Sequence, residues 1–268
     1  MEESSGFQVS GSAPENYERY NPVIMAPFIE AVLTKVAIRP GDAVLDVACG
    51  TGLVARRAAT LTGPTGRVVG LDINPGMLRV ARASSVPDGC AIEWREGSAL
   101  DLPLSADEFH VILCQQGVQF FPDLALAMRE MARVAAPGAR LAVSFWAASE
   151  EQPYMQAQRE GLQRAIGSIG AIAGAFELDP AYCCELLTAA GFREASAERV
   201  TATVSLPPME SFALGQASTL PVAPAIAALD QQQRLAYVRH MEESLSANRT
   251  EAGTYACPFV SWVVSAMR

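Results

Sequence analysis

Short apolar runs alternate with longer amphipathic segments through the middle of this 268-residue chain. The runs VLDV, RVVGL, AIEW, VILC and LAVSF are short and rich in β-branched or large apolar residues, which is typical of buried strands. The segments between them, such as LVARRAATLT and LALAMREMARV, have the spacing of amphipathic helices. Five such units, with a turn at Pro137 and Gly138 before the fifth strand, predict a doubly wound α/β core over residues 38–148.

Helical patterns flank this core on both sides. Residues 14–37 predict a broken helical cap, which follows a polar tail at 1–13 that we expect to be flexible. Residues 150–178 and 207–250 predict two helical insertions. Between them, Asp179 and Pro180 begin a helix that a strand at 194–206 follows, and a last strand occupies 257–267. Because half of the residues are hydrophobic, one large core can form, and the sequence predicts a single domain over 1–268.

The segment VLDVACGTG, residues 44–52, joins a predicted strand to a tight glycine turn. Gly50 and Gly52 allow the backbone to approach a ligand where a Cβ atom would collide. Asp46 precedes this turn, and its carboxylate would repel a pyrophosphate but suits a ligand with an ammonium or a sulfonium group. No Lys-Ser or Lys-Thr pair follows, which excludes a P-loop. The glycine spacing alone leaves a nicotinamide-dependent oxidoreductase open.

A second acidic residue, Asp72, ends the next predicted strand twenty residues after Gly52. Together with DVACGTG, it makes the chain similar to the class I S-adenosylmethionine (SAM) dependent methyltransferases. The resemblance covers about residues 40–148. Within this family, the chain is similar in type to the ubiquinone and menaquinone biosynthesis methyltransferases. The resemblance implies that Asp72 binds the two ribose hydroxyls. At the turn of Gly97, Ser98 and Ala99, Ser98 replaces the Asp that the family usually has, although its hydroxyl can still accept a hydrogen bond.

The resemblance also implies a fold, a cofactor and a site. The fold is a Rossmann-like doubly wound sheet of about seven strands, mostly parallel with the last strand antiparallel, and the two helical insertions form a lid over the substrate. The cofactor is SAM, with S-adenosylhomocysteine as its product and no metal. The residues expected to bind the cofactor are Tyr20, Asp46, Ala48, Gly50, Thr51, Gly52, Asp72, Ile73, Met77, Gly97, Ser98, Ala99 and Gln115.

Charge and cysteine usage narrow the class of partner. The chain has 20 basic and 29 acidic residues, a net charge of −9, which argues against broad contact with nucleic-acid phosphates. Its six cysteines show no CxxC spacing and no histidine companions, so they predict buried thiols rather than a zinc site. The N-terminus lacks the pattern of a signal peptide, and no apolar run approaches the ~20 residues of a membrane span. We therefore expect a cytoplasmic enzyme with a small-molecule substrate; a homodimer is common in such enzymes.

The substrate is expected between the cap, the insertions and the carboxyl edge of the sheet. Tyr17 and Tyr20 lie three residues apart on one helical face, and we expect Tyr20 near the methionine end of SAM; the alternative is that both tyrosines only anchor the helix. Gln119 is the preferred substrate contact, although some of the glutamines at this strand end could simply bond to backbone. The residues expected in the substrate pocket are Tyr17, Gln116, Gln119, Phe120 and Trp146.

No catalytic residue stands out in the sequence, because methyl transfer from a sulfonium needs little beyond alignment and removal of water. His110, at the start of a buried strand, is expected to be structural, and His240 is the weak candidate for a base. The leading hypothesis is transfer of a methyl group to O, N or C of a small, largely apolar metabolite. The alternatives are a SAM-binding enzyme that catalyses another reaction, such as a cyclisation, and a non-catalytic SAM-binding module.

Overall fold

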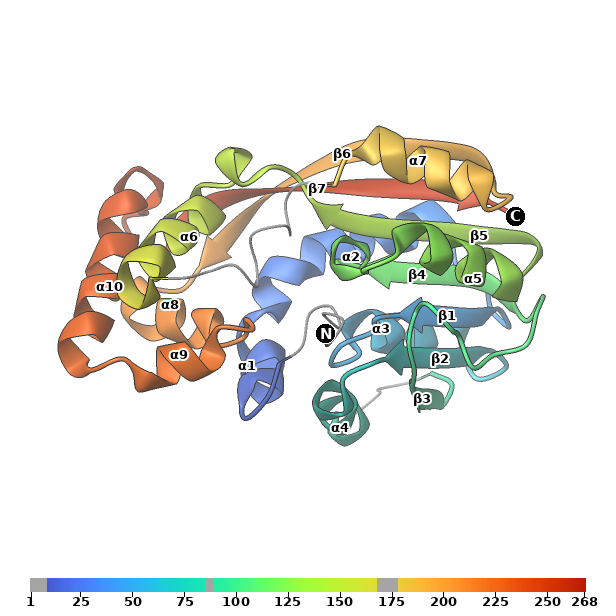
Figure 1. The fold of residues 1–268 in the computed structure, drawn as a ribbon, viewed down its shortest axis with the longest axis horizontal. Helices are drawn as coiled ribbons and strands as arrows, with labels where there is room; N and C mark the ends of the chain where they lie inside the picture. The colour runs from blue at the N-terminus through green and yellow to red at the C-terminus, as the bar shows by residue number, and fades with distance from the viewer. Residues whose placement is uncertain (1–8, 85–88, 168–177) are drawn as a thin grey trace.

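The computed structural model describes residues 9–84, 89–167 and 178–268. Within these ranges the chain forms one seven-stranded sheet, with helices on both faces (Figure 1). The strands are β1 (Ala43–Val47), β2 (Arg67–Asp72), β3 (Ile92–Glu96), β4 (Phe109–Gln115), β5 (Ala135–Trp146), β6 (Arg193–Leu206) and β7 (Tyr255–Met267). The longer helices are α1 (Ala13–Tyr20), α2 (Pro22–Val36), α3 (Leu53–Thr62), α4 (Pro75–Ala83), α5 (Leu124–Val134), α6 (Pro153–Ile166), α7 (Pro180–Ala189), α8 (Met209–Ala217), α9 (Ala223–Ala228) and α10 (Gln231–Ser244).

The strand order is β3-β2-β1-β4-β5-β7-β6. Strands β1 to β5 pair in parallel, whereas β7 runs antiparallel to both of its neighbours, β5 and β6. The prediction of a mostly parallel Rossmann-like sheet with an antiparallel last strand is therefore confirmed. The chain reverses its direction of winding between β1 and β4, and the crevice at such a point is where open α/β sheets bind ligands.

Side chains of the central strands point alternately to two hydrophobic cores. Val44 and Val68 pack in the core that contains α2 and α3, whereas their neighbours Leu45 and Val69 pack in the core that contains α5 and α7. This arrangement follows from the two-residue period of a strand, and it requires central strands that are apolar on both faces. Asp46 is buried within one of these strands, which makes it an unusual residue for its position.

Strands β6 and β7 are 14 and 13 residues long, and they extend beyond the other strands toward a lobe of helices (Figure 1). The lobe consists of α6 and of α8, α9 and α10, which come from the two predicted insertions; α10 packs against both α6 and α8. The part of the first insertion at 168–177 lies outside the described residues. This lobe covers one end of the sheet and faces the crevice at the carboxyl ends of the strands.

Two local predictions need correction. The tail predicted over 1–13 is partly ordered: residues 1–8 lie outside the described residues, but Val9 and Ala13 are buried against Met77 of α4. The fifth strand begins earlier than predicted, because Pro137 and Gly138 lie inside β5, where Gly138 has a φ of 81° and the register with β4 shifts. The N-terminal segment is helical with a break, as predicted: α1 ends at Tyr20 and α2 begins at Pro22.

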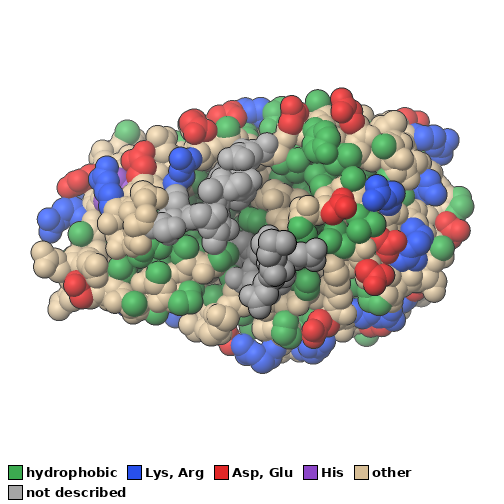
Figure 2. All heavy atoms as spheres, viewed as in Figure 1, with side chains coloured by type: hydrophobic (Ala, Val, Ile, Leu, Met, Phe, Trp, Pro, Cys, Tyr) green, Lys and Arg blue, Asp and Glu red, His purple; other side chains and the backbone are tan. Residues whose placement is uncertain are grey.

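The surface carries charges of both signs. On the face drawn in Figure 2, Lys and Arg side chains are interspersed with Asp and Glu side chains. Among the described residues, no helix combines the length and the apolar character that crossing a membrane requires.

Candidate functional site

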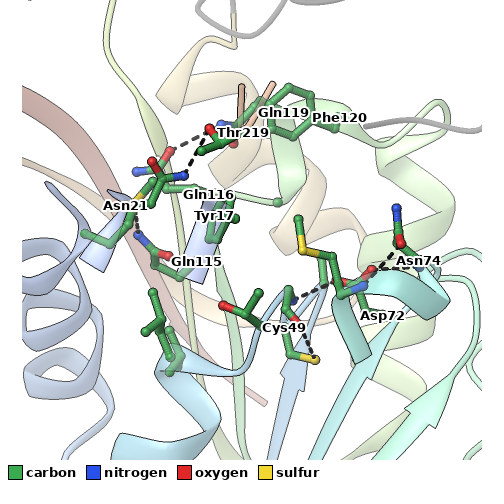
Figure 3. Close-up of a pocket in the computed structure, with 18 of the residues that line it drawn as sticks. Tyr17, Asn21, Cys49, Asp72, Asn74, Gln115, Gln116, Gln119, Phe120 and Thr219 are labelled. Carbon is green, nitrogen blue, oxygen red and sulfur yellow. Dashed lines mark hydrogen bonds between the residues drawn. The ribbon is translucent and has the colours of Figure 1, made fainter. Parts of the chain in front are cut away.

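A cavity of about 380 Å³ lies at the carboxyl ends of the parallel strands, and residues of α6 and α8 line its other side. Figure 3 shows part of its lining. Loops after β1, β2, β3 and β4 form one side of it, and Tyr154 and Gln216 of the helical lobe contribute to the other. Its apolar lining includes Ile24, Met25 and Trp146. The cavity therefore joins the expected cofactor loops to the helices that were expected to cover the substrate.

The glycine turn after β1 has an unusual backbone. Ala48, Gly50 and Gly52 all have positive φ angles, of 55°, 55° and 86°. The turn is fixed to the next strand because the Cys49 amide donates to the Leu71 carbonyl at 3.0 Å. Gly52 precedes the first residue of α3, so this turn points the N-terminus of a helix toward the cavity.

Asp46 lines this cavity and is only 1% exposed. Among the described residues, neither of its carboxylate oxygens has a hydrogen-bond partner. Desolvation raises the pKa of Asp46 to about 8, and the nearby backbone amide of Ala55, which does not reach hydrogen-bond geometry, offsets this only partly. A buried carboxylate without a partner is costly, which indicates that a positively charged group of a ligand completes this site.

Asp72, at the end of β2, ties the glycine turn to α4 (Figure 3). One carboxylate oxygen accepts the Gly50 amide at 2.7 Å, and the other accepts the Asn74 amide at 2.8 Å. Burial raises the pKa of Asp72, while these backbone amides act in the opposite direction. Asn74 caps α4 by accepting bonds from the amides of Gly76 and Met77, so the Asp72 carboxylate is held at a fixed helix terminus.

Most of the predicted site residues meet at this cavity. The predicted cofactor residues that line it are Asp46, Ala48, Gly50, Thr51, Asp72, Ile73, Met77, Gly97, Ser98, Ala99 and Gln115. The predicted substrate residues that line it are Tyr17, Gln116, Gln119, Phe120 and Trp146.

Two predicted cofactor residues, Tyr20 and Gly52, are placed elsewhere. The ring of Tyr20 packs edge-on against Phe212 with the ring centres 6.0 Å apart, and it covers the Cα of Gly215. Tyr20 therefore anchors α1 to α8, whereas Tyr17, one turn earlier, lines the cavity. Gly52 lies behind the turn, with the indole of Trp94 against its Cα, so its role is to shape the loop.

The glutamines beyond β4 form a directed chain of hydrogen bonds. Gln119 donates to Gln116 at 3.2 Å, Gln116 donates to the Ser261 hydroxyl at 2.9 Å, and Ser261 donates to the Phe145 carbonyl at 2.9 Å. Because the chain ends on a backbone carbonyl, which can only accept, each amide must donate in this direction. The Gln119 oxygen is left buried and without a partner among the described residues. Gln115 is separate and donates to the Met25 sulfur at 3.4 Å.

Neither histidine lines the cavity. The Nδ1 of His110 accepts the Ala43 amide at 3.0 Å, which supports the structural role expected for it. His240, the weak candidate for a base, lies between α10 and α6, where its ring contacts Arg164 at 2.9 Å and the Ala157 carbonyl at 3.1 Å. The packing of α10 on α6 thus directs this side chain away from the expected reaction centre, and His240 cannot act there as a base.

All six cysteines are free, and five of them are buried. Burial raises the pKa of the Cys49 and Cys114 thiols, so they remain protonated at neutral pH. Among the residues that the structure describes, no group of three or more His, Cys, Asp or Glu side chains could hold a metal ion.

Several polar residues of the cavity were missed in the sequence. They are Asn21, Tyr154, Gln158, Gln216 and Thr219. They lie at the break between α1 and α2, on α6, and on or just after α8. A helical pattern was visible in each segment, but the sequence held no signal for how these segments face one another.

Comparison with known proteins agrees with this geometry. Residues 44–138 match a family described as the methyltransferase domain. This part of the chain is therefore similar to the methyltransferase domain, and the sheet order, the glycine turn and the two buried carboxylates agree with that similarity.

Individual relatives show which methyltransferases the chain is similar to. The chain is 39% identical over 109 residues to the 2-phytyl-1,4-naphthoquinone methyltransferase of Synechococcus elongatus. This match covers 40% of this chain and 47% of that protein. It is 40% identical over 108 residues to the ubiquinone/menaquinone biosynthesis C-methyltransferase of Ectopseudomonas mendocina, covering 40% and 42%. The match therefore spans less than half of each relative. The crystal structure of the [4+2]-cyclase SpnF is similar in fold, with a TM-score of 0.55, 17% identity and 98% of both chains covered.

Proposed function

We propose that the protein transfers the methyl group of SAM to a small, largely apolar acceptor of the quinone or phenol type. The observation that carries this proposal is one cavity lined both by the unpartnered carboxylate of Asp46 and by the apolar wall around Trp146. The relatives at about 40% identity are named as quinone methyltransferases. The cyclase shares the fold alone at 17% identity, so it does not favour the non-methylating alternative.

The described residues fit the proposed cofactor. Asp46 would bind the α-ammonium group of SAM, because its buried oxygens lack any other partner. Asp72 would bind the ribose, and Ser98 and Ala99 would lie along the adenine, since these residues line the cavity beside it. When bound, SAM supplies the reactive methyl group on its sulfonium. The glycine turn then allows the cofactor to lie close to the backbone at the start of α3.

The acceptor would be aligned mainly by shape and by exclusion of water. The described residues that line the cavity include neither His nor Lys. The tyrosines there are poor bases at neutral pH, because burial raises the pKa of Tyr17 to about 12 and also raises the pKa of Tyr154. Alignment of the acceptor with the methyl group is therefore the main source of rate acceleration that these residues can provide.

Titration with SAM and S-adenosylhomocysteine tests the proposed function. Wild-type protein is expected to bind both by calorimetry, and Asp72→Ala is expected to bind each at least tenfold more weakly, because the glycine turn loses its anchor. Glu185→Ala, which removes one exposed carboxylate from α7, is the control for net charge. Absence of binding to the wild type would overturn the proposal. An acceptor screen then follows the mass gain of one CH₂ group.

The pH dependence of SAM binding tests the role of Asp46. In the free protein the pKa of Asp46 is about 8, so binding of an ammonium group at pH 7 requires loss of its proton. The affinity is therefore expected to rise with pH up to about 8, and then to fall as the α-amino group of SAM loses its own proton at about 7.7–8.0. Calorimetry at pH 7 in buffers of different ionisation enthalpy should detect the release of nearly one proton. Unchanged heats in all buffers would contradict this role.

Gln119 is the proposed contact to the acceptor. Its unpartnered oxygen can accept a bond only from an N–H or O–H group of the acceptor. Gln119→Leu is expected to raise the KM for the acceptor about tenfold, the effect of one lost hydrogen bond, without changing the Kd for SAM. The matched control is Gln156→Leu, since Gln156 is exposed on α6. Unchanged Michaelis parameters for Gln119→Leu would remove this contact from the proposal.

A cytoplasmic location and a homodimer stay predictions.

A further inference from the structure

A second group of polar side chains lies in the same cavity, on the lobe side and apart from the glutamines after β4. Asn21, Tyr154, Gln158, Gln216 and Thr219 are each at most 7% exposed. They come from three separate parts of the chain, namely the break between α1 and α2, helix α6, and the end of α8. Neutral polar groups are costly to bury, so a cluster of five in a cavity wall indicates a binding role.

These side chains are joined in one network. The Gln216 oxygen accepts both the Tyr154 hydroxyl at 3.2 Å and the Gln158 amide. The Gln216 nitrogen donates to the Asn21 oxygen at 3.2 Å, and the Asn21 nitrogen donates to the Thr219 hydroxyl at 3.5 Å. The helical lobe and the N-terminal helices are therefore connected through side chains that also line the cavity.

The network keeps some donor groups that no described residue uses. An amide group carries two N–H donors, and Gln216 donates only one of them to a described residue, whereas Gln158 faces both Gln216 and the Tyr237 hydroxyl. The Thr219 hydroxyl accepts a bond from Asn21, and no described residue accepts its own proton. The Gln216 oxygen is already shared by two donors. The wall therefore keeps an N–H group of Gln216 and the hydroxyl proton of Thr219, which can donate to the oxygen of a carbonyl group.

The charges around the cavity exclude an anionic group at this wall. Arg159 is the one cation among the described lining residues, but it is exposed and contacts Ser149 at 3.3 Å. The carboxyl groups of Asp46 and Asp72 also line the cavity, and neither can supply a positive charge. A carboxylate or a phosphate buried against the amides would therefore lack a counter-charge, whereas a neutral carbonyl needs none.

We propose that this network is the binding site for a neutral carbonyl oxygen of the methyl acceptor; the inference rests on the proposed methyltransferase function and specifies its substrate class. The acceptor would place its carbonyl against Gln158, Gln216 and Thr219. Its apolar body would lie against Trp146 and the methionines of the cavity. The network thus determines specificity and takes no part in the transfer of the methyl group.

Three naphthalenes of similar size provide a direct test: 2-acetylnaphthalene, 2-ethylnaphthalene and 2-naphthoate. Their binding to the full chain is measured by equilibrium dialysis, with and without saturating S-adenosylhomocysteine. The variants are Gln158→Leu and the nearly isosteric Thr219→Val, with Gln156→Leu on the solvent side of α6 as the control. Circular dichroism and thermal melting check that each variant is folded.

In each of the two variants, the Kd of the ketone relative to that of the hydrocarbon is expected to rise about tenfold over wild type, the effect of one lost hydrogen bond. The control should leave this ratio unchanged, and wild type should bind 2-naphthoate at least tenfold more weakly than the ketone. An unchanged ratio in both folded variants, or equal binding of ketone and carboxylate, would overturn the inference. Titration with S-adenosylhomocysteine is a separate readout. If wild-type protein does not bind it, the proposed methyltransferase function is overturned. The ratio of the ketone Kd to the hydrocarbon Kd alone decides whether the network binds a carbonyl group.

Discussion

Asp46→Asn is expected to weaken SAM binding strongly and, at the same time, to stabilise the cofactor-free protein. The carboxylate is buried without a partner, and desolvation raises its pKa from 3.8 to about 8. At pH 7 the folded protein must therefore keep a proton on a group that the unfolded chain ionises freely. This difference costs roughly 2–4 kcal/mol of folding free energy, and the neutral amide of Asn avoids it. Loss of the ligand's ammonium partner should reduce the affinity for SAM at least a hundredfold.

The effect on stability has a defined pH dependence. A carboxyl group with a raised pKa in the folded state contributes its full stability below the unfolded pKa of 3.8 and loses it as the pH rises to about 8. The melting temperature of Asp46→Asn should therefore exceed that of wild type by an amount that grows between pH 4 and about 8 and then stays constant. Differential scanning calorimetry without SAM measures this difference. A gap that is the same at every pH would contradict the assignment, and Asp107→Asn, an exposed substitution, is the control.

The fold could be predicted because it depends on local patterns. The apolar strands, the cap formed by Asn74 before Pro75, and the start of α7 at Asp179 are all signals within a few residues of sequence. The glycine turn and the two acidic strand ends were equally local. They lie at the edge of a parallel sheet, and the topology of such a sheet brings the ends of its strands together without further information.

The parts that could not be predicted depend on packing between distant segments. Tyr17 and Tyr20 share one face of α1 in the sequence, but α8 packs on that helix and covers Tyr20, so only Tyr17 reaches the cavity. His240 is similarly directed toward Arg164 by the packing of α10 on α6. The network around Gln216 joins residues almost 200 positions apart. Helical periodicity predicts each segment but not the angle at which two segments meet.

Trp94 links β3 to the glycine turn, and this contact explains the second large effect that we expect. Its indole ring lies over the Cα atoms of Gly52 and Gly70, so a Cβ at either position would overlap the ring. Gly70 has an ordinary backbone, whereas Gly52 has a φ of 86°, which side chains rarely adopt. The two glycines therefore share a steric constraint but differ in their conformational constraint, and the difference can be measured.

Gly70→Ala is expected to cost roughly 1–3 kcal/mol of unfolding free energy through overpacking, and Gly52→Ala to cost roughly a further 1–2 kcal/mol because of its left-handed backbone. In a Trp94→Leu background, which removes the ring, the cost of Gly70→Ala should largely disappear, but that of Gly52→Ala should fall only by the steric part. Urea unfolding of the single and double variants gives both coupling energies. If Trp94→Leu rescues both glycine substitutions equally, the backbone of Gly52 carries no separate cost, and the shape of the turn depends on the tryptophan alone.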